Sequence, residues 1–511
     1  MQLNIKSFYL KCIDVFCLLI LIGVIIGSYR RPNIPWDSWA YHLPFSALIF
    51  DINNARANFI LSDDFLPRFN GFPLFADWLQ GLLWKFTGNV KSTVLISSVG
   101  LAGFILFANR FFKCNLSILV LGLLTIPQIS LHVLATYSDL FFGVLVSLQF
   151  ISAIAIQQFY MRGSYPVSQK IGWALLFLIA GAIGGNTKMW GPFLCIAISF
   201  FMLIYVAIEA KSIKKIKYLI LLCAVTSILS CSTLIKNYQN FANPFYPITV
   251  NIPLLNIELA GPEDDHSTNP GFAKSFGPLA QPIYFFTSIT EIDWLIRGIN
   301  FYYSFDSEPG GNPKRFDKAR AGGWWGPFII LNILLLIYIY KSLNSKLKSS
   351  NANESNNNFS FYLFVFITIF ISFIPQSHSL RYFFFWPICL IFLNSLYIKR
   401  TPLWSRFSAI VVSIYLILFL YSIFGLRGEQ FRDEPFNKNS IKLLLKNKTQ
   451  DEIVNVPEDF PQLKQAKELG GICLGPDYTP NQIRWSAIFH QNTYVLEQGN
   501  SECKYLPAFT K

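Results

Sequence analysis

Long apolar blocks with few charges constrain this chain of 511 residues more than any other feature. Charged residues make up 14% of the chain, whereas soluble proteins carry about 25%, so the composition argues against a soluble multidomain enzyme. A helix that crosses the roughly 30 Å hydrocarbon core of a bilayer needs about 20 apolar residues. The sequence therefore predicts an all-α polytopic membrane protein with about 11 transmembrane helices, over residues 10–28, 92–109, 115–133, 139–158, 171–186, 190–208, 217–235, 325–340, 359–375, 382–398 and 407–425.

Basic residues gather in alternate linkers between these blocks, most densely at Lys211, Lys214, Lys215 and Lys217. Linkers rich in Lys and Arg stay on the cytoplasmic side of a membrane, which predicts that the N-terminus lies inside and the C-terminus outside. The net charge of +13 is spread over such linkers and forms no continuous basic stripe. We therefore expect membrane lipids as partners and no nucleic acid.

This orientation leaves large segments on the outer side. They comprise residues 29–91 and 236–324, as loops of a transmembrane domain over 1–425, and a C-terminal segment over 426–511. Cys473 and Cys503 lie in that C-terminal segment, where an oxidising compartment allows a disulfide. Two free thiols are the alternative, since the geometry that a disulfide needs is not visible in the sequence.

The first outer segment begins with the aromatic stretch from Pro35 to Pro44, which contains Asp37. If the stretch is helical, Tyr41 lies on the same face as Asp37. Neighbouring tryptophans would partly desolvate this carboxylate and make it more basic, as a general base acting on a hydroxyl requires. The alternative is that Asp37 only caps a helix at the membrane surface.

Three further polar positions map to the outer ends of predicted spans. Asp139 begins the fourth span and is either its N-cap or a functional acid. Lys188 follows a glycine turn that a phosphate can approach, or it only extends along the membrane surface. Arg381, next to Tyr382, is likewise either a phosphate ligand or a membrane anchor.

Taken together, these stretches resemble the GT-C superfamily of membrane glycosyltransferases, in the bacterial branch related to protein O-mannosyltransferases and the aminoarabinose transferase. The resemblance is carried in order by Asp37 with Tyr41-His42-Leu43-Pro44, Asn70-Gly71-Phe72-Pro73-Leu74, Tyr137-Ser138-Asp139-Leu140, Gly185-Asn186-Thr187-Lys188, Asn243-Pro244-Phe245-Tyr246-Pro247, and Arg381-Tyr382 with Pro387. One departure is that Ser38 stands where many members carry a second acid, so we assign no metal site.

The resemblance implies a GT-C-like bundle in the inner membrane of a bacterium, with juxtamembrane helices in the first outer loop. It implies a polyprenyl-phosphate sugar as donor and a hydroxyl of a glycan, lipid or protein as acceptor, on the outer face. Asp37 would be the general base, and Lys188 and Arg381 would hold the phosphate. Tyr41, His42 and Tyr382 would bind substrate, and Asp139 would orient the acceptor or bind a divalent metal.

Other classes of protein remain open at this stage. A lipid-linked polysaccharide polymerase or ligase would depend on basic residues of the late outer loop, which are Arg297, Lys314 and Arg315. A transporter or flippase would need ionisable groups or broken helices near the middle of the membrane. The centres of the predicted spans are nearly uncharged, which argues against ion-coupled transport. A non-catalytic assembly protein is a further alternative if Asp37 is only a cap.

Overall fold

The computed structural model describes most of the predicted membrane domain and short parts of the C-terminal segment. The described residues are 5–30, 37–52, 55–58, 65–162, 166–210, 213–252, 257–263, 276–290, 325–350, 355–374, 376–377, 379–401, 404–426, 472–474, 493–496 and 503–506. Arg297, Lys314 and Arg315, named above for a polymerase, lie outside them.

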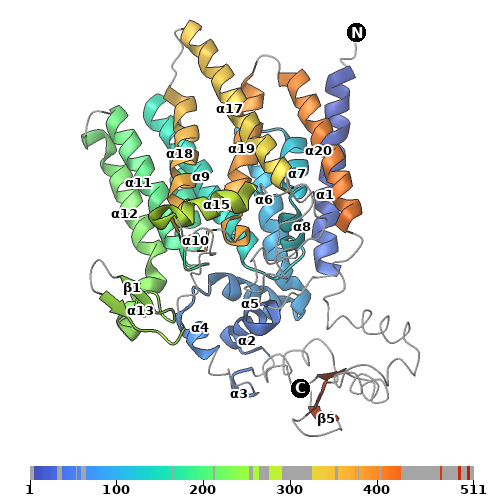
Figure 1. Ribbon diagram of the computed structural model, residues 1–511, viewed down its shortest axis with the longest axis vertical. Coiled ribbons are helices and arrows are strands. Elements are labelled where there is room, and N and C mark those ends of the chain that lie inside the picture. Colours follow the sequence, from blue (N-terminus) through green and yellow to red (C-terminus); the bar gives the residue numbers. More distant parts are fainter. Residues whose placement is uncertain are drawn as a thin grey trace.

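A bundle of helices forms the body of the molecule (Figure 1). Its members are α1 (Ile5–Arg30), α6 (Leu95–Phe112), α7 (Leu116–Leu124), α8 (Pro127–His132), α9 (Asp139–Arg162), α10 (Val167–Gly185), α11 (Gly191–Ala210), α12 (Ile213–Ser230), α17 (Trp325–Ser350), α18 (Ser355–Ser372), α19 (Phe385–Arg400) and α20 (Trp404–Leu426). Every predicted apolar block therefore contains helix, and the all-α class of the membrane domain is confirmed.

The expected count of about 11 spans is not confirmed. Six helices within the described residues are long and apolar enough to cross a membrane, or seven if α12 and the bent helix α13 (Ser232–Phe241) are one span. The block 115–133 forms two short helices, because Pro127 lacks the N–H that a continuous helix needs and Ile126 before it is extended. These candidate spans establish an integral membrane protein.

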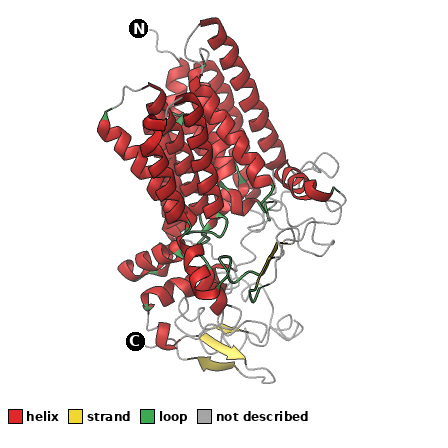
Figure 2. Ribbon diagram, turned by 90° about the vertical axis from the view of Figure 1, so that its left-hand side faces the viewer, coloured by secondary structure: helices red, strands yellow, loops and turns green. Residues whose placement is uncertain are grey.

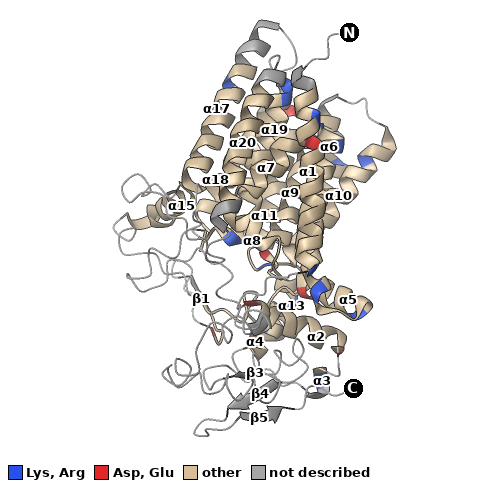
Figure 3. Ribbon diagram, turned by 90° about the vertical axis from the view of Figure 1, so that its right-hand side faces the viewer, with Lys and Arg blue, Asp and Glu red and all other residues tan. Residues whose placement is uncertain are grey.

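Charged residues lie towards the two ends of the bundle and leave the middle of the helices free of charge in the described part (Figure 3). This distribution suits a bundle whose middle lies in hydrocarbon, where an ionised side chain is costly.

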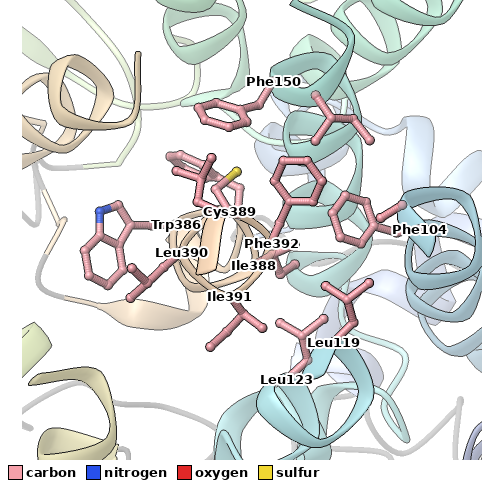
Figure 4. Close-up of a cluster of buried hydrophobic side chains, with 14 of the residues drawn as sticks. Phe104, Leu119, Leu123, Phe150, Trp386, Ile388, Cys389, Leu390, Ile391 and Phe392 are labelled. Atoms are coloured by element: carbon pink, nitrogen blue, oxygen red, sulfur yellow. The ribbon is translucent and has the colours of Figure 1, made fainter. Parts of the chain in front are cut away.

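Helix α19 lies at the centre of the bundle and packs against α7, α9 and α17. Nearly all of its side chains from Phe385 to Ile398 are buried. Figure 4 shows Ile388, Ile391 and Phe392 of this helix surrounded by apolar side chains of neighbouring helices. A helix that is apolar on all sides is expected in such a position, and it holds the residues that precede it, Leu380–Phe383, in a fixed place.

Short elements gather at the end of the bundle opposite the N-terminus (Figure 1). From the first predicted outer segment come the π-helical turn η1 (Ser38–His42), α2 (Leu43–Phe50), α3 (Ala55–Asn58), α4 (Leu66–Gly71) and α5 (Phe75–Thr87), followed by the 3-10 turn η3 (Val90–Val94). The second contributes α13, the antiparallel strands β1 (Val250–Ile252) and β2 (Ile257–Leu259), the turn η5 (Gly277–Leu279) and α15 (Ala280–Thr290). The 3-10 turn η7 (Leu380–Phe383) enters α19 at the same end.

The described parts of the C-terminal segment form a three-stranded sheet, drawn as arrows in Figure 2. Its order is β3 (Ile472–Leu474), β4 (Thr493–Leu496) and β5 (Cys503–Leu506). Cys473 and Cys503 lie on the two outer strands, which are about 9.6 Å apart at the usual strand spacing. Since a disulfide needs Cα atoms within about 7 Å, this register does not favour the expected pairing.

Candidate active site

A cavity of about 410 Å³ opens among the short elements at this end of the bundle. Its walls come from η1, α4, α5, the α10–α11 connection, the loop after α13, and η7. Six of the seven side chains predicted for the site line it, namely Asp37, Tyr41, His42, Lys188, Arg381 and Tyr382, and the seventh, Asp139, contacts Lys188. The fold thus brings together residues as distant in the chain as Asp37 and Arg381, which are 344 positions apart.

Asp37 does not act as a helix cap in this structure. It precedes η1, but its side chain makes no capping hydrogen bond, and its backbone N–H is donated to the hydroxyl of Tyr137 at 3.4 Å. Its carboxylate instead accepts a hydrogen bond from Arg381, with 2.9 Å between Oδ2 and Nη1. Both side chains are mostly buried, and such a pair is held much more strongly than a surface ion pair.

Arg381 is held on several sides within the cavity. Its other terminal nitrogen, Nη2, donates to the hydroxyl of Tyr382 at 2.8 Å. The guanidinium also lies 5.6 Å from the ring centre of Tyr137 and 4.8 Å from that of Tyr382. The planar fork is therefore fixed in orientation, as recognition of a phosphate through two oxygens requires.

A second ion pair lies beside the first. The Lys188 ammonium is 2.8 Å from Oδ1 of Asp139, which is the first residue of α9 and is almost fully buried. Lys188 also lies 5.4 Å from the ring centre of Tyr382, so this tyrosine contacts both cations. The glycine turn before Lys188 is needed for packing, because a Cβ on Gly185 would come within 2.5 Å of the Ser230 carbonyl oxygen.

His42 forms a third pair with Asp77, a residue that the sequence did not single out. Nδ1 of His42 lies 2.7 Å from Oδ1 of Asp77, and both side chains are buried. Asp77 is in the first turn of α5, and Gln80 lies on the same face three residues later. Gln80 donates to the carbonyl of Thr136 at 2.6 Å and joins α5 to the start of α9. The signal available in the sequence was the spacing of Asp77 and Gln80, which places two polar residues on one helix face.

Arg68 and Glu263 complete the charged wall and were also missed. Arg68 of α4 makes two hydrogen bonds to the Glu263 carboxylate, at 2.7 and 3.1 Å. Burial alone would lower the pKa of Arg68, but the hydrogen bonds and charge of Glu263 outweigh it and raise that pKa. This pair ties the first outer segment to the second across the cavity.

Tyr41 lines the cavity as a neutral phenol. Burial, together with the nearby Asp37 carboxylate, raises the pKa of Tyr41 well above its ordinary value of 10. Its ring packs against Phe45, at 5.7 Å between ring centres. The phenol therefore keeps its proton throughout the neutral pH range.

No cluster of three or more His, Cys, Asp or Glu side chains able to hold a metal occurs in the described ranges. The one acid considered above as a metal ligand, Asp139, has Lys188 as its partner.

Fold and site together define an integral membrane protein of helices with a charged, aromatic cavity at one end of the bundle. No protein-family model matches the chain, and no curated protein matches it. Among solved structures it matches ArnT, the aminoarabinose transferase, from Cupriavidus metallidurans bound to undecaprenyl phosphate, at 12% identity and a TM-score of 0.42. That match covers 78% of this chain and 62% of the ArnT chain.

The apo structure of the same ArnT also matches, at 12% identity and a TM-score of 0.37, over 95% of this chain and 86% of the other. ArnT belongs to the GT-C family, whose motifs the sequence resembles.

Proposed function

We propose that the chain is a membrane glycosyltransferase that moves a sugar from a polyprenyl phosphate to an acceptor hydroxyl at the outer face of the membrane. The observation that carries the proposal is the pairing of two cations, Arg381 and Lys188, with two acids, Asp37 and Asp139, in and beside one cavity at the end of the bundle, where none of the four side chains is more than 18% exposed. The motif resemblance supplies the class of donor. The position suits a lipid donor, whose phosphate lies at the surface of the membrane while its tail stays in hydrocarbon.

In the proposed reaction the oxygen of the acceptor hydroxyl attacks the anomeric carbon in line with the departing phosphate. The new C–O bond forms as the bond between that carbon and the phosphate oxygen breaks, and the polyprenyl phosphate leaves with the electron pair. Asp37 takes the proton of the acceptor hydroxyl. The configuration at the anomeric carbon is inverted.

Arg381 and Lys188 stabilise the negative charge that grows on the leaving phosphate, which is often the largest contribution to catalysis. In the structure both cations are engaged by carboxylates. A donor phosphate competes with Asp37 for Arg381, so arrival of the donor releases the Asp37 carboxylate to act as base. Asp139 remains with Lys188 and holds it toward the phosphate.

The test compares purified wild type with Asp37→Asn for release of polyprenyl phosphate from a panel of polyprenyl-phosphate sugars, with membrane extract as the source of acceptor. We expect release by wild type and a loss of about 10²–10⁴-fold in the variant, the usual range for a general base. Asp51→Asn is the matched control, because Asp51 lies in the same outer segment and does not line the cavity.

Equal release by Asp37→Asn and wild type would remove Asp37 from the chemistry. Absence of release by wild type over the whole panel would reject the transferase and favour the polymerase or transporter. Thermal unfolding of each variant in detergent shows whether a loss of activity reflects loss of folded protein.

A further inference from the structure

The cavity contains two polar side-chain atoms to which the proposed reaction assigns no role. Nε2 of His42 and Oγ of Ser138 are buried and have no hydrogen-bond partner among the residues that the structure describes. Both residues line the cavity. A buried polar atom left unpaired costs free energy, so both atoms are suited to a partner that arrives with the substrate.

The pairing of His42 with Asp77 determines what its free nitrogen can bind. The carboxylate of Asp77 accepts a hydrogen bond from Nδ1 of His42, so Nε2 is the ring nitrogen left for a ligand, and it can pair with a hydroxyl as acceptor or as donor. The Ser138 hydroxyl both donates and accepts. These are the complements of a sugar hydroxyl, which also donates and accepts.

His42 and Ser138 approach the same place in the fold. The ring of His42 lies 6.1 Å from the ring of Tyr137, and Ser138 follows Tyr137 in the chain. The ring centre of Tyr41 lies 4.4 Å from that of His42. Hydrogen-bonding groups with adjacent aromatic rings form an environment suited to a sugar, whereas Lys188 and Arg381 suit a phosphate.

We propose that His42 and Ser138 form the sugar subsite and bind hydroxyls of the donor sugar. Asp77 is a positioning residue that holds the ring of His42 through Nδ1. The inference rests on the proposed function and adds to it the residues that bind the sugar.

The substitutions that test the subsite separate the two ring nitrogens of His42. His42→Asn retains a nitrogen near the position of Nδ1 and so keeps a donor for Asp77, but it removes Nε2. His42→Gln places a polar atom near the position of Nε2 and serves as the conservative variant. Ser138→Ala removes the hydroxyl with little change in volume.

The assay measures kcat/KM for release of undecaprenyl phosphate from undecaprenyl-phosphate mannose or another uncharged member of the panel. It also measures the Kd for undecaprenyl phosphate, which has no sugar. We expect His42→Asn and Ser138→Ala to lower kcat/KM by about 10–100-fold, the effect of leaving a buried partner unpaired, while the Kd stays within about twofold. His42→Gln should recover part of the loss.

Two outcomes would overturn the subsite. Wild-type kcat/KM in His42→Asn and Ser138→Ala would show that these groups do not bind the sugar. An equal loss of undecaprenyl phosphate binding would show a structural role instead. Failure of the proposed function is distinguishable from either result, because wild type would then release no undecaprenyl phosphate from any donor.

Discussion

At the scale of single residues, the cavity depends on Arg381, which contacts Asp37 and Tyr382 and lies over two aromatic rings. We predict that Arg381→Lys weakens binding of undecaprenyl phosphate by about 10-fold, or 1.4 kcal/mol. The charge is kept, but the planar fork that holds two oxygens is lost. Binding is measured by titration of the purified protein in detergent.

Arg56→Lys is the matched control for this substitution. Arg56 donates to the carbonyls of Leu48 and Ile49 and does not line the cavity. An unchanged Kd in Arg381→Lys, or an equal change in both variants, would contradict the role of Arg381 as the phosphate ligand.

The neighbouring pair of Lys188 and Asp139 makes a prediction about stability. Removing one partner of a buried pair costs about 3–5 kcal/mol, because the other charge is left uncompensated. We expect Lys188→Met to destabilise the protein by this amount and the double variant Lys188→Met/Asp139→Leu to recover most of the loss. Denaturant unfolding in detergent measures the free energy of unfolding of each variant. If the losses of the two single variants simply add in the double variant, the two side chains are not coupled.

At the scale of elements, the wall of the cavity depends on close contact between α4 and the turn after α13. A Cβ on Gly71 would lie 2.3 Å from the carbonyl oxygen of Tyr246. Asn237 reinforces the contact by donating to the carbonyls of Gly71 and Tyr246, at 2.8 and 3.0 Å. The two outer segments are thus joined at their backbones as well as through Arg68 and Glu263.

We predict that Gly71→Ala destabilises the protein by at least about 1–3 kcal/mol, the usual cost of overpacking, and lowers transferase activity with it. Gly103→Ala is the matched control, since a Cβ there meets nothing within 4 Å and the residue lies in α6, where Ala is the better helix former. A melting temperature for Gly71→Ala equal to that of Gly103→Ala would show that the contact is not tight.

Some residues of the cavity can be predicted from the sequence and others cannot. Asp37 and Arg381 were found because each begins or follows an apolar block at the same predicted face, so a local pattern was sufficient. Asp77 was missed because a single acid on an amphipathic surface helix is normally on its solvent face; here α5 turns that face inward and leaves Asp77 3% exposed. Glu263 was missed because its partner Arg68 lies 195 residues away, and only the fold brings them together.

At the scale of the whole molecule, apolar periodicity predicted where helices lie better than which of them cross the membrane. Composition reports burial, and a central helix such as α19 is apolar because protein surrounds it on all sides. Hydropathy also does not detect local breaks in a helix. The block 115–133 is apolar throughout, yet Pro127 divides it into two helices. The sequence could not predict that distant residues line one cavity. It predicted only that these residues lie on the same side of the membrane.

That shared placement leads to a prediction about orientation. The positive linkers place the N-terminus inside, so the end of the bundle that bears α5 and the cavity should face outward. Phe86 near the end of α5 is 89% exposed, and Arg110 lies exposed near the opposite end of α6. In a cysteine-free background, we expect Phe86→Cys to react with a membrane-impermeant maleimide in intact spheroplasts and Arg110→Cys to react only after the membrane is opened. The reverse pattern would place the cavity on the cytoplasmic side, where the acceptor would have to be a cytoplasmic molecule. Labelling of both positions in intact spheroplasts would indicate leaky membranes, and labelling of an abundant cytoplasmic protein measures that leakage independently.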